Sequence, residues 1–203
     1  MNESRIKRDL DALAKQDPDL RRGLKQIGYP APRIRDQGFA TLLSTIVSQQ
    51  ISTEAAAAIM NRVRGLLPEM QAEAVLRLRE GALREAGLSE RKVEYVESLA
   101  QAITEKRFDP SGLVDMDDSA AIESITSLRG FGRWSAEIYL MFSLQRGDIF
   151  PAGDLAIRVG LQKLKGLEDP LNENQAREVS AHWAPYRSAG SLFLWHYYRG
   201  APT

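Results

Sequence analysis

The chain contains no cysteine and only two histidines among its 203 residues. Without cysteine there is no disulfide, no cysteine-ligated zinc and no iron–sulfur cluster. With only two histidines, the composition also argues against a conventional metal centre.

Long hydrophobic runs are missing as well. No apolar run approaches the roughly 20 residues that a membrane-spanning helix needs. The N-terminus, MNESRIKRDLDALAKQ, is charged from its first residues, unlike a signal peptide. The composition, 43% hydrophobic and 27% charged, is typical of a globular protein. We therefore expect a cytoplasmic protein with no membrane contact.

Neither sign of charge is in excess. The chain has 27 basic and 27 acidic residues, so its formal net charge is zero. That balance argues by itself against strong nucleic-acid binding. Residues 127–165 hold six basic and three acidic residues, and this local excess is too mild to indicate DNA on its own.

Strand patterns are absent too, whereas apolar residues recur at helical spacing along nearly the whole chain. Ser52 and Ser89 are placed as N-caps, and Gly87 ends a helix. The two prolines of YPAPRIRD keep that segment out of a regular helix. The expected fold class is all-α, with about ten short helices and short loops.

What is present is a glycine-rich connection between two expected helices, LRGFGRWSA, at residues 128–136. Gly130 and Gly132 flank Phe131, whose ring can tuck between the helices. Glycine allows the positive φ of a tight reversal and leaves no side chain in front of its N–H group. The start of a helix favours an anion, so a phosphate can bind here. The alternative is an ordinary corner between helices that binds nothing.

Together with Gly153-Asp154 about twenty residues later, this motif resembles the signature of base-excision DNA glycosylases. It is most similar to the 3-methyladenine DNA glycosylase II family of the helix-hairpin-helix superfamily. IVSQQISTEAAAAI (46–59) and LREAGLSERKVEYVESLA (83–100) share the resemblance, which covers most of the chain.

The resemblance implies a single two-lobed, all-α glycosylase unit over residues 1–203, with the active site between the lobes. One lobe spans residues 37–124, and the other combines 1–36 with 125–203. The chain is too short, and too helical at its start, to hold the N-terminal β-domain of larger relatives.

By resemblance, Asp154 is the catalytic aspartate. A fixed negative charge stabilises the positive charge that develops on deoxyribose as the base leaves. The alternative is that Asp154 only caps the helix LAIRVGLQKL. Both roles are compatible, because a cap position orients the side chain.

Trp134 stands where strand-cutting relatives carry a lysine that forms a Schiff base. Tryptophan cannot do this chemistry. The sequence therefore predicts a monofunctional hydrolase whose nucleophile is water.

Base chemistry within a duplex requires extrusion of the nucleotide. By resemblance, Gln50 is the intercalating wedge, and Gln49 beside it bonds to the opened bases or the backbone. A polar end of a helix is the alternative interpretation. Some family members carry leucine at this position, so the glutamine leaves the degree of DNA bending open.

The resemblance also implies the remaining site residues. The expected base pocket comprises Trp134, Trp195, Ile138 and Tyr139, and aromatic faces would hold a cationic base. The alternative for Trp195 is that it only packs within an ordinary buried helix. The expected phosphate-binding residues are Gly130, Phe131, Gly132 and Arg133. A structural Na⁺ or K⁺ ion would bind the main-chain carbonyls of Thr126, Leu128 and Phe131.

The function expected from the resemblance is base excision repair: hydrolysis of the N-glycosidic bond of alkylated bases in double-stranded DNA, by a monomer that requires no cofactor. Two alternatives stay open, a non-catalytic binder of DNA structure and a glycosylase for oxidised bases. Trp134 disfavours the second. Which alkylated base is preferred is also open.

Overall fold

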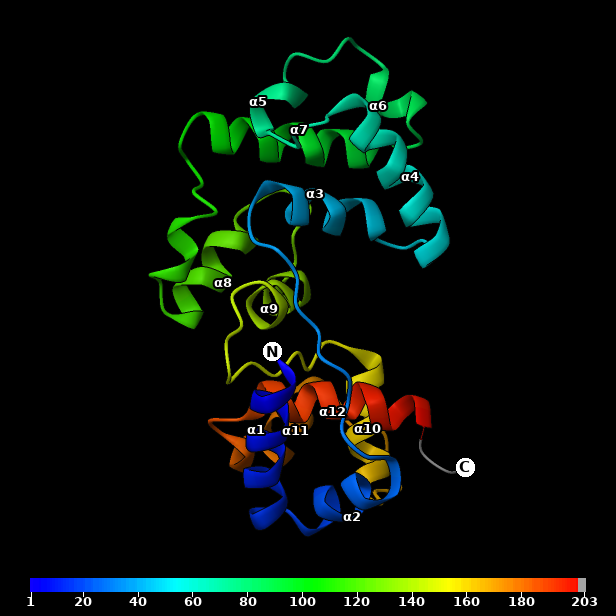
Figure 1. Cartoon of the computed structure of the whole chain (residues 1–203), viewed down its shortest axis with the longest axis vertical. Coiled ribbons are helices and arrows are strands. Elements are labelled where there is room, and N and C mark those ends of the chain that lie inside the picture. Colours follow the sequence, from blue (N-terminus) through cyan, green and yellow to red (C-terminus); the bar gives the residue numbers. More distant parts are fainter. Residues whose placement is uncertain (201–203) are drawn as a thin grey trace. The chain divides into compact units, whose positions relative to one another are not determined.

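A computed structural model describes residues 1–200 of the chain (Figure 1). These residues form twelve α-helices and two 3₁₀ helices and contain no strand, which confirms the all-α class. None of these helices is both long enough and apolar enough to cross a membrane. The chain divides into two compact units, here called the terminal unit (residues 1–34 and 140 onward) and the middle unit (residues 35–139).

The terminal unit is a small helical bundle in which α10 and α12 pack extensively against each other. Gly160 of α10 allows this packing, because a Cβ there would lie 2.8 Å from the carbonyl oxygen of Leu194. α12 also packs against α1 and α2 (Figure 1). The elements are α1 (Glu3–Gln16), α2 (Pro18–Ile27), α10 (Leu155–Lys165), α11 (Glu173–Val179), the 3₁₀ helix η2 (Ala181–Trp183) and α12 (Arg187–Gly200).

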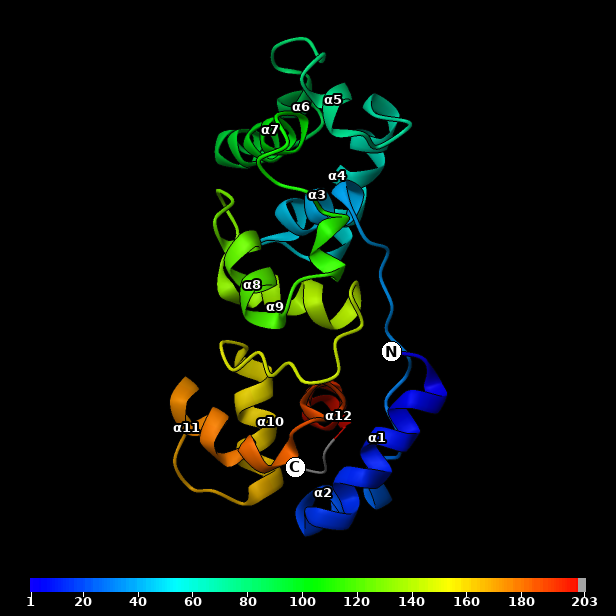
Figure 2. The same cartoon turned by 90° about the vertical axis from the view of Figure 1, so that its left-hand side faces the viewer.

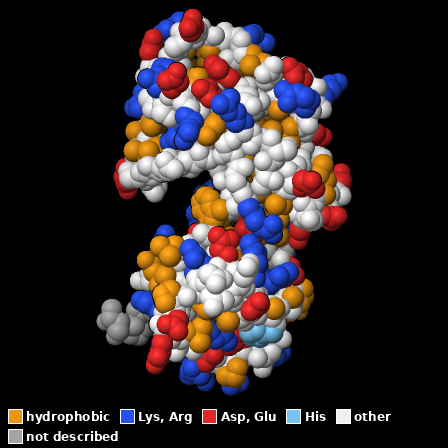
Figure 3. Space-filling model, turned by 180° about the vertical axis from the view of Figure 1, so that it is seen from behind, with side chains coloured by type: hydrophobic (Ala, Val, Ile, Leu, Met, Phe, Trp, Pro, Cys, Tyr) orange, Lys and Arg blue, Asp and Glu red, His pale blue; other side chains and the backbone are white. Residues whose placement is uncertain are grey.

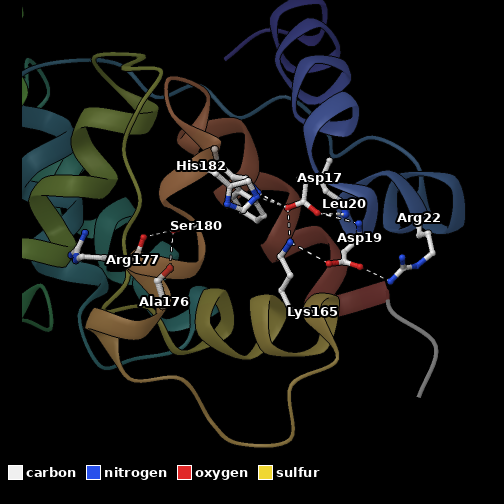
Figure 4. A network of polar contacts seen from close by, with 10 residues as sticks. Asp17, Asp19, Leu20, Arg22, Lys165, Ala176, Arg177, Ser180 and His182 are labelled. Atoms are coloured by element: carbon white, nitrogen blue, oxygen red, sulfur yellow. Dashed lines mark hydrogen bonds and ion pairs between the residues drawn. The ribbon is translucent and has the colours of Figure 1, made fainter.

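A buried carboxylate ties together elements of the terminal unit that are distant in sequence. Asp17 is the N-cap of α2, and its Oδ1 accepts from the backbone N–H groups of Asp19 and Leu20 at 3.0 and 3.1 Å. Its Oδ2 accepts from Lys165 Nζ at 2.7 Å and lies 3.1 Å from His182 Nε2 (Figure 4). One carboxylate thus links the start of α2 to the end of α10 and to η2.

The middle unit is built around α7. This helix packs against α3 and α5, and α3 packs in turn against α4 (Figures 1 and 2). The elements are α3 (Phe39–Ser48), α4 (Thr53–Leu66), α5 (Ala72–Val75), α6 (Ala82–Glu85), α7 (Glu90–Thr104), the 3₁₀ helix η1 (Gly112–Val114), α8 (Asp118–Thr126) and the first part of α9 (Arg133–Phe142).

The expected N-caps of the middle unit are confirmed. The Ser52 side chain accepts from the N–H of Ala55, and the Ser89 side chain accepts from the N–H of Lys92. Gly87 follows α6 with a φ of 104°, the left-handed conformation expected of a glycine that ends a helix.

The expected lobe boundary at residue 124 differs from the division in the structure, which falls between 139 and 140. The reason is that the glycine-rich connection packs on the middle unit. Arg129 forms an ion pair with Glu94 of α7 at 2.8 Å. A Cβ on Gly130 would collide with the ring of Tyr95, also on α7. Residues 125–139 therefore belong with the middle helices.

Charged side chains of both signs are interspersed over the face shown in Figure 3. This distribution agrees with the zero net charge of the sequence.

Candidate DNA-binding and catalytic site

The glycine-rich connection forms a tight hairpin between α8 and α9, and we call residues 128–132 the hairpin. Gly130 has a φ of 91°, and the N–H of Phe131 donates to the carbonyl of Leu128 at 3.2 Å. Phe131 is 6% exposed, so its ring is buried as the sequence predicts. Gly130 therefore needs its glycine for both conformation and space.

The end of the hairpin is open to solvent at Gly132. Gly132 is exposed, and a Cβ added to it would meet no other atom within 4 Å. The N–H groups in the first turn of a helix have no acceptor within the helix, so the start of α9 has the geometry for an anion. Arg133 is exposed and bonds through Nε to Glu137 Oε1 at 3.0 Å. The open side of Gly132 is compatible with the predicted phosphate contact.

The two glutamines predicted to act on the DNA stack lie in the turn between α3 and α4. We call residues 48–52 the wedge turn. Gln50 is exposed and has a φ of 57°, an uncommon conformation for a residue other than glycine. Gln49 points elsewhere, and its Nε2 donates to the carbonyl of Gly130 at 2.8 Å. Gln50 is thus presented to solvent, whereas Gln49 bonds to the hairpin.

Lys92 of α7 supports the same turn. Its Nζ donates to the carbonyls of Val47 and Gln49 at 2.7 and 2.8 Å. Burial lowers the pKa of Lys92 below its usual value. Nothing in the spacing of residues 89–104 shows which loop α7 will face, so this lysine cannot be identified from the sequence pattern.

The three predicted pocket residues of α9 have different surroundings. Trp134 is 43% exposed, whereas Ile138 and Tyr139 are 5% and 3% exposed. The hydroxyl of Tyr139 accepts from the N–H of Gly38 at 2.8 Å, which ties α9 to the start of α3. Trp134 is therefore the most exposed of the three.

Asp154 occupies the N-cap of α10, and its Oδ1 accepts from the N–H of Ile157 at 3.1 Å. The side chain is half-buried. The capping role expected of Asp154 is confirmed, and this bond orients the carboxylate, as a catalytic role requires.

The segment before Asp154 is held at several points. The N–H of Ile149 donates to Ser188 Oγ at 2.9 Å, and Arg177 donates to the carbonyl of Phe150 at 2.9 Å. The N–H of Asp154 itself donates to the carbonyl of Pro151 at 2.9 Å. The carboxylate therefore projects from a fixed loop, which suits preorganised electrostatics.

Trp195 of α12 is half-buried and belongs to an aromatic cluster in the terminal unit. Its ring lies 5.7 Å from that of Phe142, and the Arg33 guanidinium lies 4.6 Å from the Phe142 ring and 6.0 Å from the Trp195 ring. Trp195 also lines a pocket of about 260 Å³ between α12 and the loop 30–33. Arg33 is a second residue that the sequence pattern does not reveal, since only folding brings this loop to α12.

Among residues 1–200, no group of three or more His, Asp or Glu side chains is placed to hold a metal ion. The cation predicted at Thr126, Leu128 and Phe131 would use main-chain carbonyls instead. Carbonyl oxygens suit Na⁺ or K⁺, and the Leu128 carbonyl already accepts one bond in the hairpin turn. This ion stays a prediction.

The predicted site residues divide between the two units. The hairpin, the wedge turn and the pocket residues of α9 belong to the middle unit, whereas Asp154 and Trp195 belong to the terminal unit. Each unit thus contributes one part of the predicted chemistry: DNA contacts from one, and the carboxylate and an aromatic cluster from the other.

Most of the chain matches a known protein family. Residues 43–185 match the family described as "HhH-GPD superfamily base excision DNA repair protein". The match covers the wedge turn, the hairpin and Asp154. The chain belongs to this superfamily.

Two curated relatives have similar sequences. DNA-3-methyladenine glycosylase 1 of Schizosaccharomyces pombe is 31% identical over 196 residues, covering 90% of this chain and 83% of the relative. DNA-3-methyladenine glycosylase of Saccharomyces cerevisiae is 31% identical over 200 residues, covering 81% of this chain and 68% of the relative.

Two solved structures have the same fold. A DNA-3-methyladenine glycosidase from Bacillus halodurans superposes with a TM-score of 0.84 at 31% identity, covering 94% of this chain and 88% of that one. The 3-methyladenine DNA glycosylase of Schizosaccharomyces pombe, solved in complex with abasic DNA, gives a TM-score of 0.80 at 28% identity, covering 96% and 98%. These likenesses agree with the helix-hairpin-helix glycosylase fold expected from the sequence.

Proposed function

We propose that this chain is a monofunctional DNA glycosylase that hydrolyses the N-glycosidic bond of alkylated bases in double-stranded DNA. The observation that carries the proposal is the position of Asp154 at the cap of α10, on a loop held by backbone and side-chain bonds. The names of the relatives, DNA-3-methyladenine glycosylases, support the class of lesion.

The proposed reaction needs one carboxylate and one water. As the bond between C1′ and the base nitrogen breaks, its electron pair leaves with the base and positive charge builds on the sugar. The Asp154 carboxylate stabilises that charge. The water oxygen then adds to C1′ and loses a proton. An alkylated purine that is already cationic leaves readily, so no second carboxyl group is needed to protonate it.

The DNA contacts of the proposal come from the middle unit. Backbone donors at the end of the hairpin bind phosphate, which fixes register without reading sequence. Gln50, exposed in the wedge turn, fills the gap left by the extruded nucleotide. Trp134 provides an exposed aromatic face for the base and no amine for a Schiff base.

The decisive experiment is Asp154→Asn. Asparagine is about as good an N-cap as aspartate, so folding survives, but the negative charge is lost. We expect single-turnover release of 7-methylguanine to fall by at least about 10²-fold. Binding to a duplex with an abasic-site analogue should be kept or improved, with one anion fewer near the phosphates.

Asp117→Asn is the matched control, because Asp117 caps α8 with the same side-chain bond, to the N–H of Ala120 at 2.8 Å. It should leave base release unchanged. An Asp154→Asn protein that stays folded and releases the base at the wild-type rate would reduce Asp154 to a helix cap. A wild-type protein that binds DNA but releases no methylated purine would make the chain a non-catalytic binder.

A further inference from the structure

The wedge turn is held from two directions within the middle unit. The last carbonyls of a helix have no partner within the helix, and a cation near them is favoured. Lys92 Nζ supplies that cation at the end of α3, with bonds of 2.7 and 2.8 Å to the carbonyls of Val47 and Gln49. Since Lys92 lies in the first turn of α7, the turn is fixed to that helix.

The Gln49 side chain links the same turn to the hairpin. Its Nε2 donates to the carbonyl of Gly130 at 2.8 Å, across 81 residues of sequence. α7 contacts the hairpin as well, through the Glu94–Arg129 ion pair of 2.8 Å and the close approach of Tyr95 to Gly130. Wedge turn, hairpin and α7 thus form one bonded assembly.

The backbone of Gln50 requires such support. A left-handed conformation at a residue other than glycine is strained and persists only where its surroundings determine it. Gln50 has a φ of 57° and an exposed side chain, so packing around that side chain does not hold it. The bonds to the residues just before it, at the carbonyls of Val47 and Gln49 and at the Gln49 side chain, therefore determine where Gln50 points.

We propose that Lys92 is a positioning residue for base extrusion, and that with Gln49 it makes the wedge and the phosphate-binding hairpin one rigid element. Phosphate contact at the hairpin then places Gln50 at a defined point of the DNA stack, with no further ordering of the turn. This proposal rests on the proposed function, because it assumes that the protein extrudes a base.

Lys92→Met tests the proposal, since methionine keeps most of the chain length and loses the three donors. Two substrates are compared under single-turnover conditions. One carries 7-methylguanine paired with cytosine, and the other carries 7-methylguanine opposite an abasic analogue, where the stack is already open. Misplacement by about 1 Å costs up to about 10²-fold in rate. We expect the rate of base release to fall by about 10- to 100-fold on the paired duplex. On the open duplex it should fall by less than about threefold, because extrusion there requires less free energy.

Three further variants complete the experiment. Lys92→Arg keeps a cation and should recover much of the rate on the paired duplex. Arg91→Met removes the same charge from the neighbouring exposed position and should match the wild type. Gln49→Met should also slow the paired duplex selectively. Because both side chains hold one turn, the rate losses caused by Gln49→Met and Lys92→Met should not add in the double variant.

The outcomes separate the two proposals. If wild-type protein releases the base from neither duplex, the proposed function fails. If wild-type protein is active and Lys92→Met keeps its rate on the paired duplex, or loses rate equally on both duplexes, the positioning role is wrong. Should Lys92→Met not fold, the same comparison with Gln49→Met decides, by the same criteria.

Discussion

The indole Nε1–H of Trp183 donates to Oδ2 of Asp17 at 2.6 Å, across 166 residues of sequence. Both side chains are buried. Asp17 is therefore an N-cap, through its bonds from the N–H groups of Asp19 and Leu20, and also a buried partner of Trp183 and Lys165. Figure 4 shows the bonds from Lys165 and Leu20. Burial alone raises the pKa of Asp17, but bonds from Lys165, Trp183 and the N–H of Leu20 outweigh it and lower the pKa to about 2.

Asp17→Asn should therefore destabilise the terminal unit. Removing one partner of a buried ion pair costs about 3 kcal/mol or more, measured as the free energy of unfolding in urea at pH 7. Asp19→Asn, at the half-buried edge of the same cluster, is the control and should cost much less.

The same carboxylate should make the free energy of unfolding depend on pH. Its folded pKa, about 2, lies below the ordinary value of 3.8, so its stabilisation is present above about pH 4 and is lost as pH falls towards 2. This linkage amounts to roughly 2 kcal/mol. The stability gap between wild type and Asp17→Asn should narrow over that window. A gap that stays constant from pH 5 to pH 2.5 would show that charge contributes nothing there.

The two hairpin glycines should behave differently. Gly130→Ala places a side chain at a φ of 91° and against Tyr95, so it should lower the melting temperature as well as DNA affinity. Gly132→Ala has room for its methyl group and should fold normally. Its methyl group would stand beside the backbone N–H groups proposed to bind phosphate, so binding to any duplex, damaged or not, should weaken.

Gly65→Ala is the control for both, since Gly65 lies in α4 with no neighbour within 4 Å of an added Cβ. Fluorescence anisotropy with an abasic-analogue duplex measures the effect, together with thermal melting. Unchanged affinity in Gly132→Ala would remove the hairpin from the DNA interface.

Trp134 predicts the products of the reaction. Without an amine at this position no Schiff base forms, so the DNA strand should stay intact after base release and break only after alkali treatment. Borohydride reduction during turnover is the measurement. Trapping of a covalent complex between protein and DNA would show that another amine attacks the sugar, and the monofunctional assignment would be wrong.

Arg33 predicts a preference among lesions. Its guanidinium lies 6.0 Å from the Trp195 ring, so a cationic base stacked there would meet a like charge. Arg33→Gln should raise the ratio of rates for cationic 7-methylguanine over neutral 1,N6-ethenoadenine by about 3- to 10-fold. Arg199→Gln, exposed at the rim of the same pocket, is the matched control. Equal changes for both lesions would place Trp195 outside the base pocket.

The local features of this protein were predictable from its sequence. Ser52, Ser89 and Asp154 each cap a helix by accepting from an N–H three residues ahead. Such bonds depend on few neighbours, so residue type and spacing determine them. The positive φ of Gly130 is also a local feature, because it follows from the tight reversal of the hairpin.

Long-range contacts were decided by the tertiary structure alone. The sequence marks Asp17 as a cap before Pro18, but not as the partner of Trp183. It places Lys92 in the first turn of a helix without showing that its ammonium group reaches the end of α3. The observed boundary between the units, after residue 139, differs from the expected one at residue 124 for the same reason. Packing of the hairpin on α7 assigns residues 125–139 to the middle unit. Side-chain spacing encodes which face of a helix is buried, whereas the partner of that face depends on how all the helices pack together.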